Sequence, residues 1–264
     1  MTTGGLAGLL ALDAQLRAAL QAEGGFSHVA AYGSVPQGQA DAHSDLEYWA
    51  FLAPGAAVEA QDWLSTQLDV QHFVVNEFGT PTALLPGLRR VELHVVPAAR
   101  LPEVEDWTPQ HVRPTQMLVK DEDGRLARHL AVLAGRTVHP ADDAGLILGR
   151  LLNWLAFGLN VLARGERVRA HELLGWVQGG LLRLARLQEK RTDHWPNPSR
   201  RAEQELSVAS LTRYAGITAG LPDLERAYAG AVTWTLDLAD ELRLTVPLAL
   251  ARDLRERAPS VPRT

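Results

Sequence analysis

The sequence predicts an α+β protein in two parts, a β-sheet domain flanked by helices over residues 1–135 and an all-helical domain over residues 136–264. Short runs rich in β-branched and aromatic residues occur only in the first part, where loops and a few helical segments separate them. After about Gly135, long leucine-rich stretches with helical spacing replace these runs. A chain of 264 residues is long enough to bury one large core or two modest ones.

The first part begins with an amphipathic helix. Residues 6–23 repeat leucines at helical spacing and stop at Gly24-Gly25, a typical glycine stop. Further helices are expected at 56–68 and 125–135. The expected strands are HVAAY (28–32), LEYWAFL (46–52), DVQHFVV (69–75), RRVELHVV (89–96) and a short strand in MLVKDEDG (117–124).

The second part is expected to be a set of helices broken by one polar insert. The helical periods cover 142–164, 168–191, 198–214 and 222–244, before a short frayed tail from Arg257. The insert RTDHWPNPS contains two prolines, and its Ser199 is expected to cap the helix that follows. His171-Glu172 is interpreted as helix surface, and three tryptophans on these helices are expected in the core: Trp154, Trp176 and Trp234.

Composition restricts the function classes. The net charge is −5, with 26 basic and 31 acidic residues interspersed along the chain, which disfavours nucleic-acid binding. There is no cysteine, so disulfides and thiolate metal sites are excluded. The longest uncharged apolar run of the second part, LLNWLAFGLNVLA, is too short to span a bilayer, and the sequence indicates a soluble, cytoplasmic protein without a membrane partner.

One motif carries chemistry: Gly33-Ser34, then ten residues, then Asp45-Leu46-Glu47. A glycine allows close backbone approach and a serine can hold phosphate oxygens where a strand gives way to a loop. Asp45 and Glu47 are two residues apart on an expected strand, so both point to one face. Two bare carboxylates about 4 Å apart repel by roughly 4 kcal/mol at an effective dielectric near 20. Because no lysine or arginine lies between Arg17 and Arg89, the sequence leaves a divalent metal or a distant basic partner to offset this repulsion.

A third carboxylate is available in VELHVV (91–96), where Glu92 and His94 share one face. If this strand neighbours the Asp45 strand, Glu92 completes a three-carboxylate site for Mg²⁺, which favours carboxylate and phosphate oxygens. Glu92 would then accept the proton of an acceptor hydroxyl or bind a second ion. The bland alternatives are a surface ion pair with Arg89-Arg90 for Glu92, a satisfied core histidine for His94, and a turn with two solvated carboxylates for the motif itself.

The pattern G-S-x10-D-x-E followed by an acidic strand resembles the DNA polymerase β-like nucleotidyltransferase superfamily, and within it the larger, two-domain lincosamide nucleotidyltransferases. The similarity includes ADAHSDLEYWAFL, RRVELHVVP, KDEDGRLARHL, RVRAHELLGWVQGGLLRLARL and HWPNPSRRAEQEL. It implies an N-terminal nucleotidyltransferase domain with a mixed sheet, three metal-binding, catalytic carboxylates at Asp45, Glu47 and Glu92, and a nucleotide-binding pair at Gly33 and Ser34.

The chain departs from the family at one place. Such loops often carry an arginine or lysine shortly after the Gly-Ser pair, whereas this loop reads VPQGQADAHS and offers only Gln37. A basic residue from elsewhere has to replace it, with Lys120, the Arg200-Arg201 pair or a neighbouring subunit as candidates.

The expected activity is Mg²⁺-dependent transfer of a nucleoside monophosphate, AMP in the first instance, from a nucleoside triphosphate to a hydroxyl of a small molecule, with two metal ions and release of pyrophosphate. The resemblance implies antibiotic inactivation and a lincosamide acceptor. The helical domain is expected to close over the acceptor and is a candidate interface of a homodimer. The alternatives are a nucleotidyltransferase that modifies a protein or tRNA, a non-catalytic nucleotide-binding module, and a helical scaffold with an accidental motif. The insert of the helical half is either a capped loop or, through His194, Trp195 or Arg200, a wall of the acceptor pocket.

Overall fold

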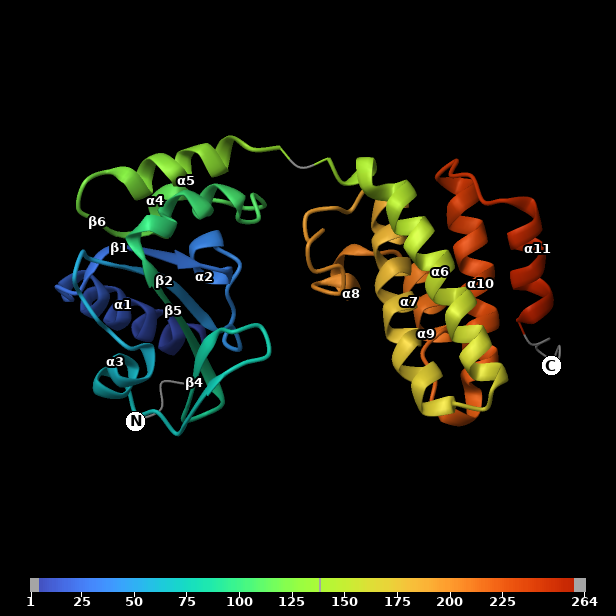
Figure 1. The fold of residues 1–264 in the computed structure, drawn as a ribbon, viewed down its shortest axis with the longest axis horizontal. Coiled ribbons are helices and arrows are strands. Elements are labelled where there is room, and N and C mark those ends of the chain that lie inside the picture. Colours follow the sequence, from blue (N-terminus) through green and yellow to red (C-terminus); the bar gives the residue numbers. More distant parts are fainter. Residues whose placement is uncertain (1–4, 138, 259–264) are drawn as a thin grey trace. The chain divides into compact units, whose positions relative to one another are not determined.

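The computed structural model describes residues 5–137 and 139–258. The chain forms two compact units, Met1–Val138 and His139–Thr264, and each is described by itself. The first unit combines a mixed sheet with helices and the second is helical (Figure 1). The predicted α+β class is confirmed.

The first unit is built on a six-stranded sheet in the order β3-β4-β5-β2-β1-β6. The strands are β1 (Phe26–Tyr32), β2 (Leu46–Leu52), β3 (His72–Val75), β4 (Pro81–Leu85), β5 (Arg89–Pro97) and β6 (Leu118–Asp121). Among the strands that the structure describes, the central pair β2 and β5 is parallel and the four other pairings are antiparallel. The sheet is therefore mixed, and the two strands of its parallel pair begin at the same end of the sheet.

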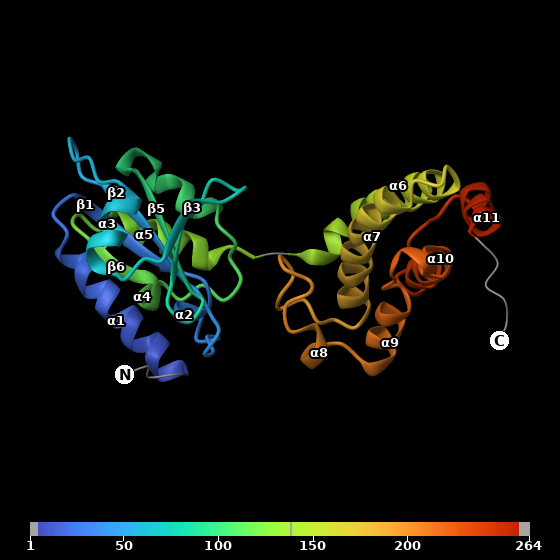
Figure 2. The ribbon, with the colours of Figure 1, turned by 90° about the horizontal axis from the view of Figure 1, so that it is seen from below.

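Helices cover both faces of this sheet (Figures 1 and 2). On one face, α1 (Leu6–Ala22) and α3 (Ala60–Gln67) pack on alternate strand residues such as Val29, Tyr48 and Leu93. On the other face, the 3₁₀ segment η1 (Ala98–Asp106) and α5 (Arg125–Gly135) pack on Ala30, Phe51 and Val96. Along β2 and β5 most residues of the first face are therefore buried, whereas most residues of the second face, such as Trp49 and His94, are half-buried. Two short helices, α2 (Ser34–Gln37) and α4 (Pro114–Met117), lie in the connections.

The sequence predicted these strands but omitted one. β4 pairs with β5 through Thr82 opposite Glu92, and its run PTALL lies between turn residues and was not recognised. Five residues are a typical strand length, yet so short a run has no periodicity to separate it from a loop. The partner strand β3 is shorter than the run DVQHFVV predicted for it.

The second unit is a helical bundle. Its helices are η2 (Pro140–Asp143), α6 (Ala144–Ala163), α7 (Arg167–Gln188), α8 (Ala202–Glu205), α9 (Val208–Gly216), η3 (Leu221–Asp223), α10 (Leu224–Glu241) and α11 (Leu248–Arg257). The core lies among α6, α7 and α10, where Leu155, Leu181 and Trp234 are buried. Helix α6 is 20 residues long and apolar enough in composition to cross a membrane, unlike the shorter run identified from sequence. Because α6 packs against α7 and α10, its apolar composition is explained by its place in the core of the bundle.

Three sequence predictions for this unit are wrong. The helix predicted over 198–214 is two helices, α8 and α9, and Ser207 rather than Ser199 caps the second of them by accepting from the Ser210 amide. Trp176 is 64% exposed, so it is no core residue, whereas Trp234 is only 2% exposed as expected. The sequence analysis did not predict α11, which ends at Arg257, and the tail expected from there lies almost wholly outside the described residues.

The polar insert before α8 is organised by a buried guanidinium. Arg186 of α7 is fully buried and donates to the carbonyl oxygens of Arg191, Pro198 and Arg200 and to Glu205. A buried charge is tolerated only when it is paired and hydrogen-bonded, and these four contacts meet that condition. The insert is consequently a fixed loop of the second unit.

Candidate functional site

The parallel pairing of β2 and β5 places two of the predicted site residues next to each other. Glu47 lies directly opposite Glu92 in the register, so their Cα atoms are about 4.8 Å apart. Asp45 comes immediately before β2, two residues from Glu47 on the same side. The three carboxylates, called the acidic site below, therefore converge at the edge of the sheet where both strands begin.

Arg90, which the sequence analysis named only as a surface ion-pair partner of Glu92, lies among them. Arg90 Nη1 donates to Asp45 Oδ2 at 3.1 Å, and Arg90 Nη2 is paired with Glu92 Oε1. The sequence left a metal or a distant basic partner to offset the carboxylate repulsion, and this structure contains the distant partner. Its signal was present, because Arg90 lies two residues before Glu92 and so shares a strand face with it. The alternative of an ion pair for Glu92 is thus also realised.

One arginine does not balance three carboxylates. Burial, followed by the neighbouring Glu92 and Asp45, raises the pKa of Glu47 to about 7. Burial also raises the pKa of Glu92, against the opposing effect of Arg90. A carboxyl group that holds its proton near neutral pH lacks enough positive charge nearby to stabilise its ionised form. A divalent cation would provide that charge.

Gly33 and Ser34 follow the end of β1, next to this site. Gly33 has φ 78°, a left-handed conformation, and a Cβ built there would lie 3.4 Å from Glu47 Oε2. Ser34 is 7% exposed, and its hydroxyl is buried without a hydrogen-bond partner among the described residues. Buried hydroxyls are normally bonded, so this oxygen is available for a ligand that approaches the glycine.

Aromatic side chains adjoin the carboxylates on the same sheet face. The ring of His94 stacks on Trp49 with centroids 3.9 Å apart and planes 4° from parallel. Trp107 packs against both Trp49 and Tyr32 at 5.2 Å. Burial and the nearby Arg100 lower the pKa of His94 to about 4, so its imidazole is neutral at pH 7. One donor atom each of Glu47, Glu92 and His94 lies within 4.8 Å of the others, which also makes His94 a candidate metal ligand.

A second cluster with the same kinds of donor lies toward the start of β1. His28, Asp121 and Asp123, called the histidine cluster below, also bring their ligand atoms within 4.8 Å of one another. Here the hydrogen bonds are complete: His28 Nε2 is 3.0 Å from Asp123 Oδ1, and its Nδ1 is 2.8 Å from Ser27 Oγ. Asp121 accepts from the amide of Ala127 at 2.9 Å in the first turn of α5. These bonds describe a structural clamp between β1, β6 and α5.

Of the sequence candidates for the missing basic residue, Lys120 is the one that lies in the first unit with the acidic site, and its ammonium group is engaged elsewhere. Lys120 Nζ donates to the carbonyl oxygen of Glu23 and lies 3.4 Å from Glu122. Arg200 and Arg201 belong to the loop of the second unit that Arg186 holds.

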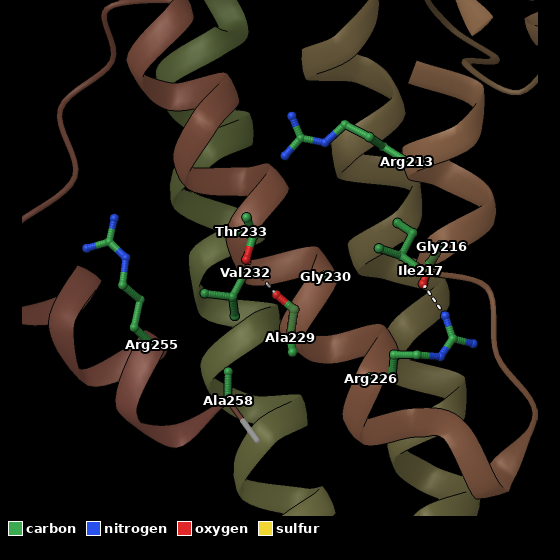
Figure 3. A pocket seen from close by; sticks show the side chains of 10 residues that line it. All are labelled: Arg213, Gly216, Ile217, Arg226, Ala229, Gly230, Val232, Thr233, Arg255 and Ala258. Carbon is green, nitrogen blue, oxygen red and sulfur yellow. Dashed lines mark hydrogen bonds between the residues drawn. The ribbon is translucent and has the colours of Figure 1, made fainter. Parts of the chain in front are cut away.

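The second unit contains open hollows of its own. One of about 610 Å³ lies between α9, α10 and α11, where Arg226 donates to the Gly216 carbonyl oxygen (Figure 3). Another, of about 480 Å³, is lined by the stacked Trp154 and Trp176 together with Trp195. His194 is buried instead and lies 2.6 Å from Glu205 through its Nδ1. Of the insert residues proposed for an acceptor pocket, Trp195 lines this second hollow.

Residues 141–260 match the family model of the C-terminal domain of lincosamide nucleotidyltransferase-like proteins. The predicted resemblance to the lincosamide nucleotidyltransferases, and with it the predicted enzyme class, is confirmed at the level of this family. The comparison with curated proteins gives no match.

Among solved structures, the chain is similar to an aminoglycoside 6-adenyltransferase from Bacillus subtilis, with 12% identity, a TM-score of 0.40, and coverage of 94% of this chain and 97% of that one. It is also similar to a nucleotidyltransferase-like protein from Exiguobacterium sibiricum 255-15, with 13% identity, a TM-score of 0.39, and coverage of 94% and 86%. At these TM-scores neither likeness supports a conclusion about this chain.

Proposed function

We propose, from the family of the helical unit and the acidic site of the first, that this protein transfers a nucleoside monophosphate from a nucleoside triphosphate to a hydroxyl of a small molecule. The observation that carries the proposal is the direct pairing of Glu47 with Glu92 in parallel strands, with Asp45 bridged to Glu92 through Arg90. The orphaned Ser34 hydroxyl beside them supports a phosphate ligand.

The donor set fits a divalent cation such as Mg²⁺, because carboxylate oxygens are its preferred protein ligands and the site lacks positive charge. Asp45, Glu47 and Glu92 would hold one or two such ions. When bound, the ions supply charge stabilisation at the phosphoryl oxygens.

The chain's own residues carry the remaining steps. Gly33 permits the triphosphate to approach the backbone, and the Ser34 hydroxyl donates to a phosphate oxygen. Glu92 accepts the proton of the acceptor hydroxyl from about 2.6–3.2 Å. The new bond forms between the acceptor oxygen and the α-phosphorus, the bond from that phosphorus to the bridging oxygen breaks, and pyrophosphate leaves.

For the acceptor we propose a lincosamide or a similar hydroxylated small molecule, with ATP as the nucleotide. The family description of the helical unit supports this choice. The acidic site favours a drug that carries an amine, and the Trp49 and Trp107 rings offer an apolar surface beside it. Cytoplasmic location and a homodimer stay predictions, as does the absence of a nucleic-acid partner.

The test is a mass-spectrometric transfer assay with lincomycin or clindamycin, ATP or GTP, and Mg²⁺. The wild type is expected to add a nucleotide mass, and Asp45→Asn and Glu47→Gln are expected to lower kcat by about 10²–10³-fold or more while remaining folded. The matched control is Glu77→Gln, an exposed carboxylate in the turn between β3 and β4, which should leave kcat unchanged. Transfer at the wild-type rate by Asp45→Asn would sink the proposal.

The same assay decides between the acceptor classes. If neither drug gains a nucleotide while a protein or tRNA substrate does, the enzyme modifies macromolecules. If no acceptor is labelled although ATP binds, the chain is a non-catalytic nucleotide-binding module.

A further inference from the structure

The proposed function does not yet assign a positively charged side chain to the triphosphate. The Gly-Ser loop has Gln37 where related loops often carry a basic residue, and the acidic site beside it would repel a polyanion. Most basic side chains of the first unit are already committed: Arg90 to Asp45 and Glu92, and Lys120 to the Glu23 carbonyl oxygen.

Arg113 lies against this loop. Gly38 ends α2, one residue after Gln37, and a Cβ built on Gly38 would lie 2.7 Å from Arg113 Nη1. Arg113 comes from the segment immediately before α4, 75 positions further along the chain (113 − 38), which is why the loop sequence gives no sign of it. Its guanidinium therefore occupies the space that a side chain at Gly38 would need.

The guanidinium is available for a ligand. Arg113 is exposed, and its guanidinium makes no hydrogen bond and no ion pair with the residues that the structure describes, although its carbonyl oxygen accepts from the amides of Gln116 and Met117. It thus differs from Arg90, whose two terminal nitrogens are paired with carboxylates. An arginine that contacts a loop without a partner of its own retains its full capacity for a bidentate phosphate contact.

The distance to the phosphate-binding pair is short. α2 has four residues, so it is about 6 Å from Ser34 to its end, a length that an arginine side chain spans. Ser34 at one end offers a buried hydroxyl without a partner, and Arg113 at the other end offers positive charge. The two groups match a chain of phosphates, with the α-phosphate toward the carboxylates and the terminal phosphates toward Arg113.

We propose that Arg113 binds the β- and γ-phosphates of the nucleoside triphosphate and takes the place of the basic residue that the loop lacks. The inference rests on the proposed function and adds a binding residue to it. Gly38 contributes to the same arrangement, because its φ of 72° disfavours a side chain and a Cβ there would displace the Arg113 guanidinium.

The test compares the dissociation constants of ATP and AMP, measured calorimetrically with Mg²⁺, in the wild type and four variants. Arg113→Gln is expected to weaken ATP binding by about 10-fold to 100-fold, since a charge-assisted hydrogen bond is lost, and to leave AMP binding unchanged. Arg113→Lys should recover part of the loss, because it keeps the charge without the planar fork. Gly38→Ala should reproduce the loss by displacing the guanidinium.

Arg128→Gln is the matched control. Arg128 is also exposed and without an ion pair among the described residues. It lies in the first turn of α5 against Gly124, near the start of β1, whereas the Gly-Ser pair follows the end of β1. It should bind ATP like the wild type. ATP affinity unchanged in Arg113→Gln, or an equal loss of ATP and AMP affinity, overturns the inference while the proposed function stands. A wild type that binds neither nucleotide overturns both.

Discussion

The acidic site and the histidine cluster contain similar donors but differ in how far those donors are satisfied. In the histidine cluster, both nitrogens of His28 have partners and Asp121 binds amides of α5. Hydrogen bonds from His28 and Arg125 hold the pKa of Asp123 well below its usual range. In the acidic site, the pKa of Glu47 is raised instead, and the Ser34 hydroxyl nearby has no partner within the described part of the chain.

The difference teaches that residue type and spacing alone do not separate a ligand site from a clamp. Glu47 and Glu92 of the acidic site, together with His94, bring three donor atoms within 4.8 Å of one another, as the histidine cluster does. What distinguishes them is the balance of charge and hydrogen bonds. A cluster whose groups are all paired stabilises the fold, whereas groups that lack partners gain favourable interactions when a ligand binds. Three measurements would break or sharpen this distinction.

The largest expected effect is a pH dependence that arises from Glu47. Its pKa is about 7 in the folded chain against 4.5 in the unfolded chain, so the folded state binds the proton more tightly. Protonated Glu47 therefore contributes about 3 kcal/mol to the free energy of unfolding of the metal-free protein. This contribution is fully present below about pH 4.5 and is lost as the pH rises through 7. Urea unfolding in EDTA between pH 5 and pH 8 should show Glu47→Gln gaining this amount relative to the wild type.

Glu77→Gln serves as the control and should follow the wild type at each pH. A difference between Glu47→Gln and the wild type that stays constant from pH 5 to pH 8 would mean that Glu47 is not short of positive charge.

A smaller effect is expected in the histidine cluster. Asp121→Ala removes the acceptor for the Ala127 amide and a neighbour of His28, and should lower the free energy of unfolding by about 1–3 kcal/mol. Nucleotidyl transfer per folded molecule should not change. Asp62→Ala, in the first turn of α3 and without such a bond, should cost less than about 1 kcal/mol. Lost transfer in folded Asp121→Ala would give this cluster a role in the reaction.

The smallest effect is stabilisation by the metal. Mg²⁺ at ten times its dissociation constant should raise the free energy of unfolding by about 1.4 kcal/mol in the wild type and in Asp121→Ala. Glu47→Gln should lose this increment. The reverse pattern, with the increment kept in Glu47→Gln and lost in Asp121→Ala, would assign the ion to the histidine cluster.

Much of the fold could be predicted because its information is local. The period of two in LEYWAFL and the leucine periods of α6, α7 and α10 fix which side of each element is buried. The motif that includes Asp45 and Glu47 is local as well, since two residues on one strand share a face without reference to any other element. Where local signals conflict, prediction failed: the break between α8 and α9 follows from the contacts of Arg186 and the cap at Ser207, which no helical period records.

Sequence alone determined the residue types at the site: a Gly-Ser pair, three carboxylates, and a loop without a basic residue. The tertiary structure decided their surroundings, because the parallel register of β2 and β5 set Glu47 opposite Glu92 and brought Arg90 to Asp45. It also laid Arg113 on Gly38, across 75 positions of sequence (113 − 38). Charge balance depends on distances through space, and these are fixed by strand pairing and packing rather than by spacing along the chain.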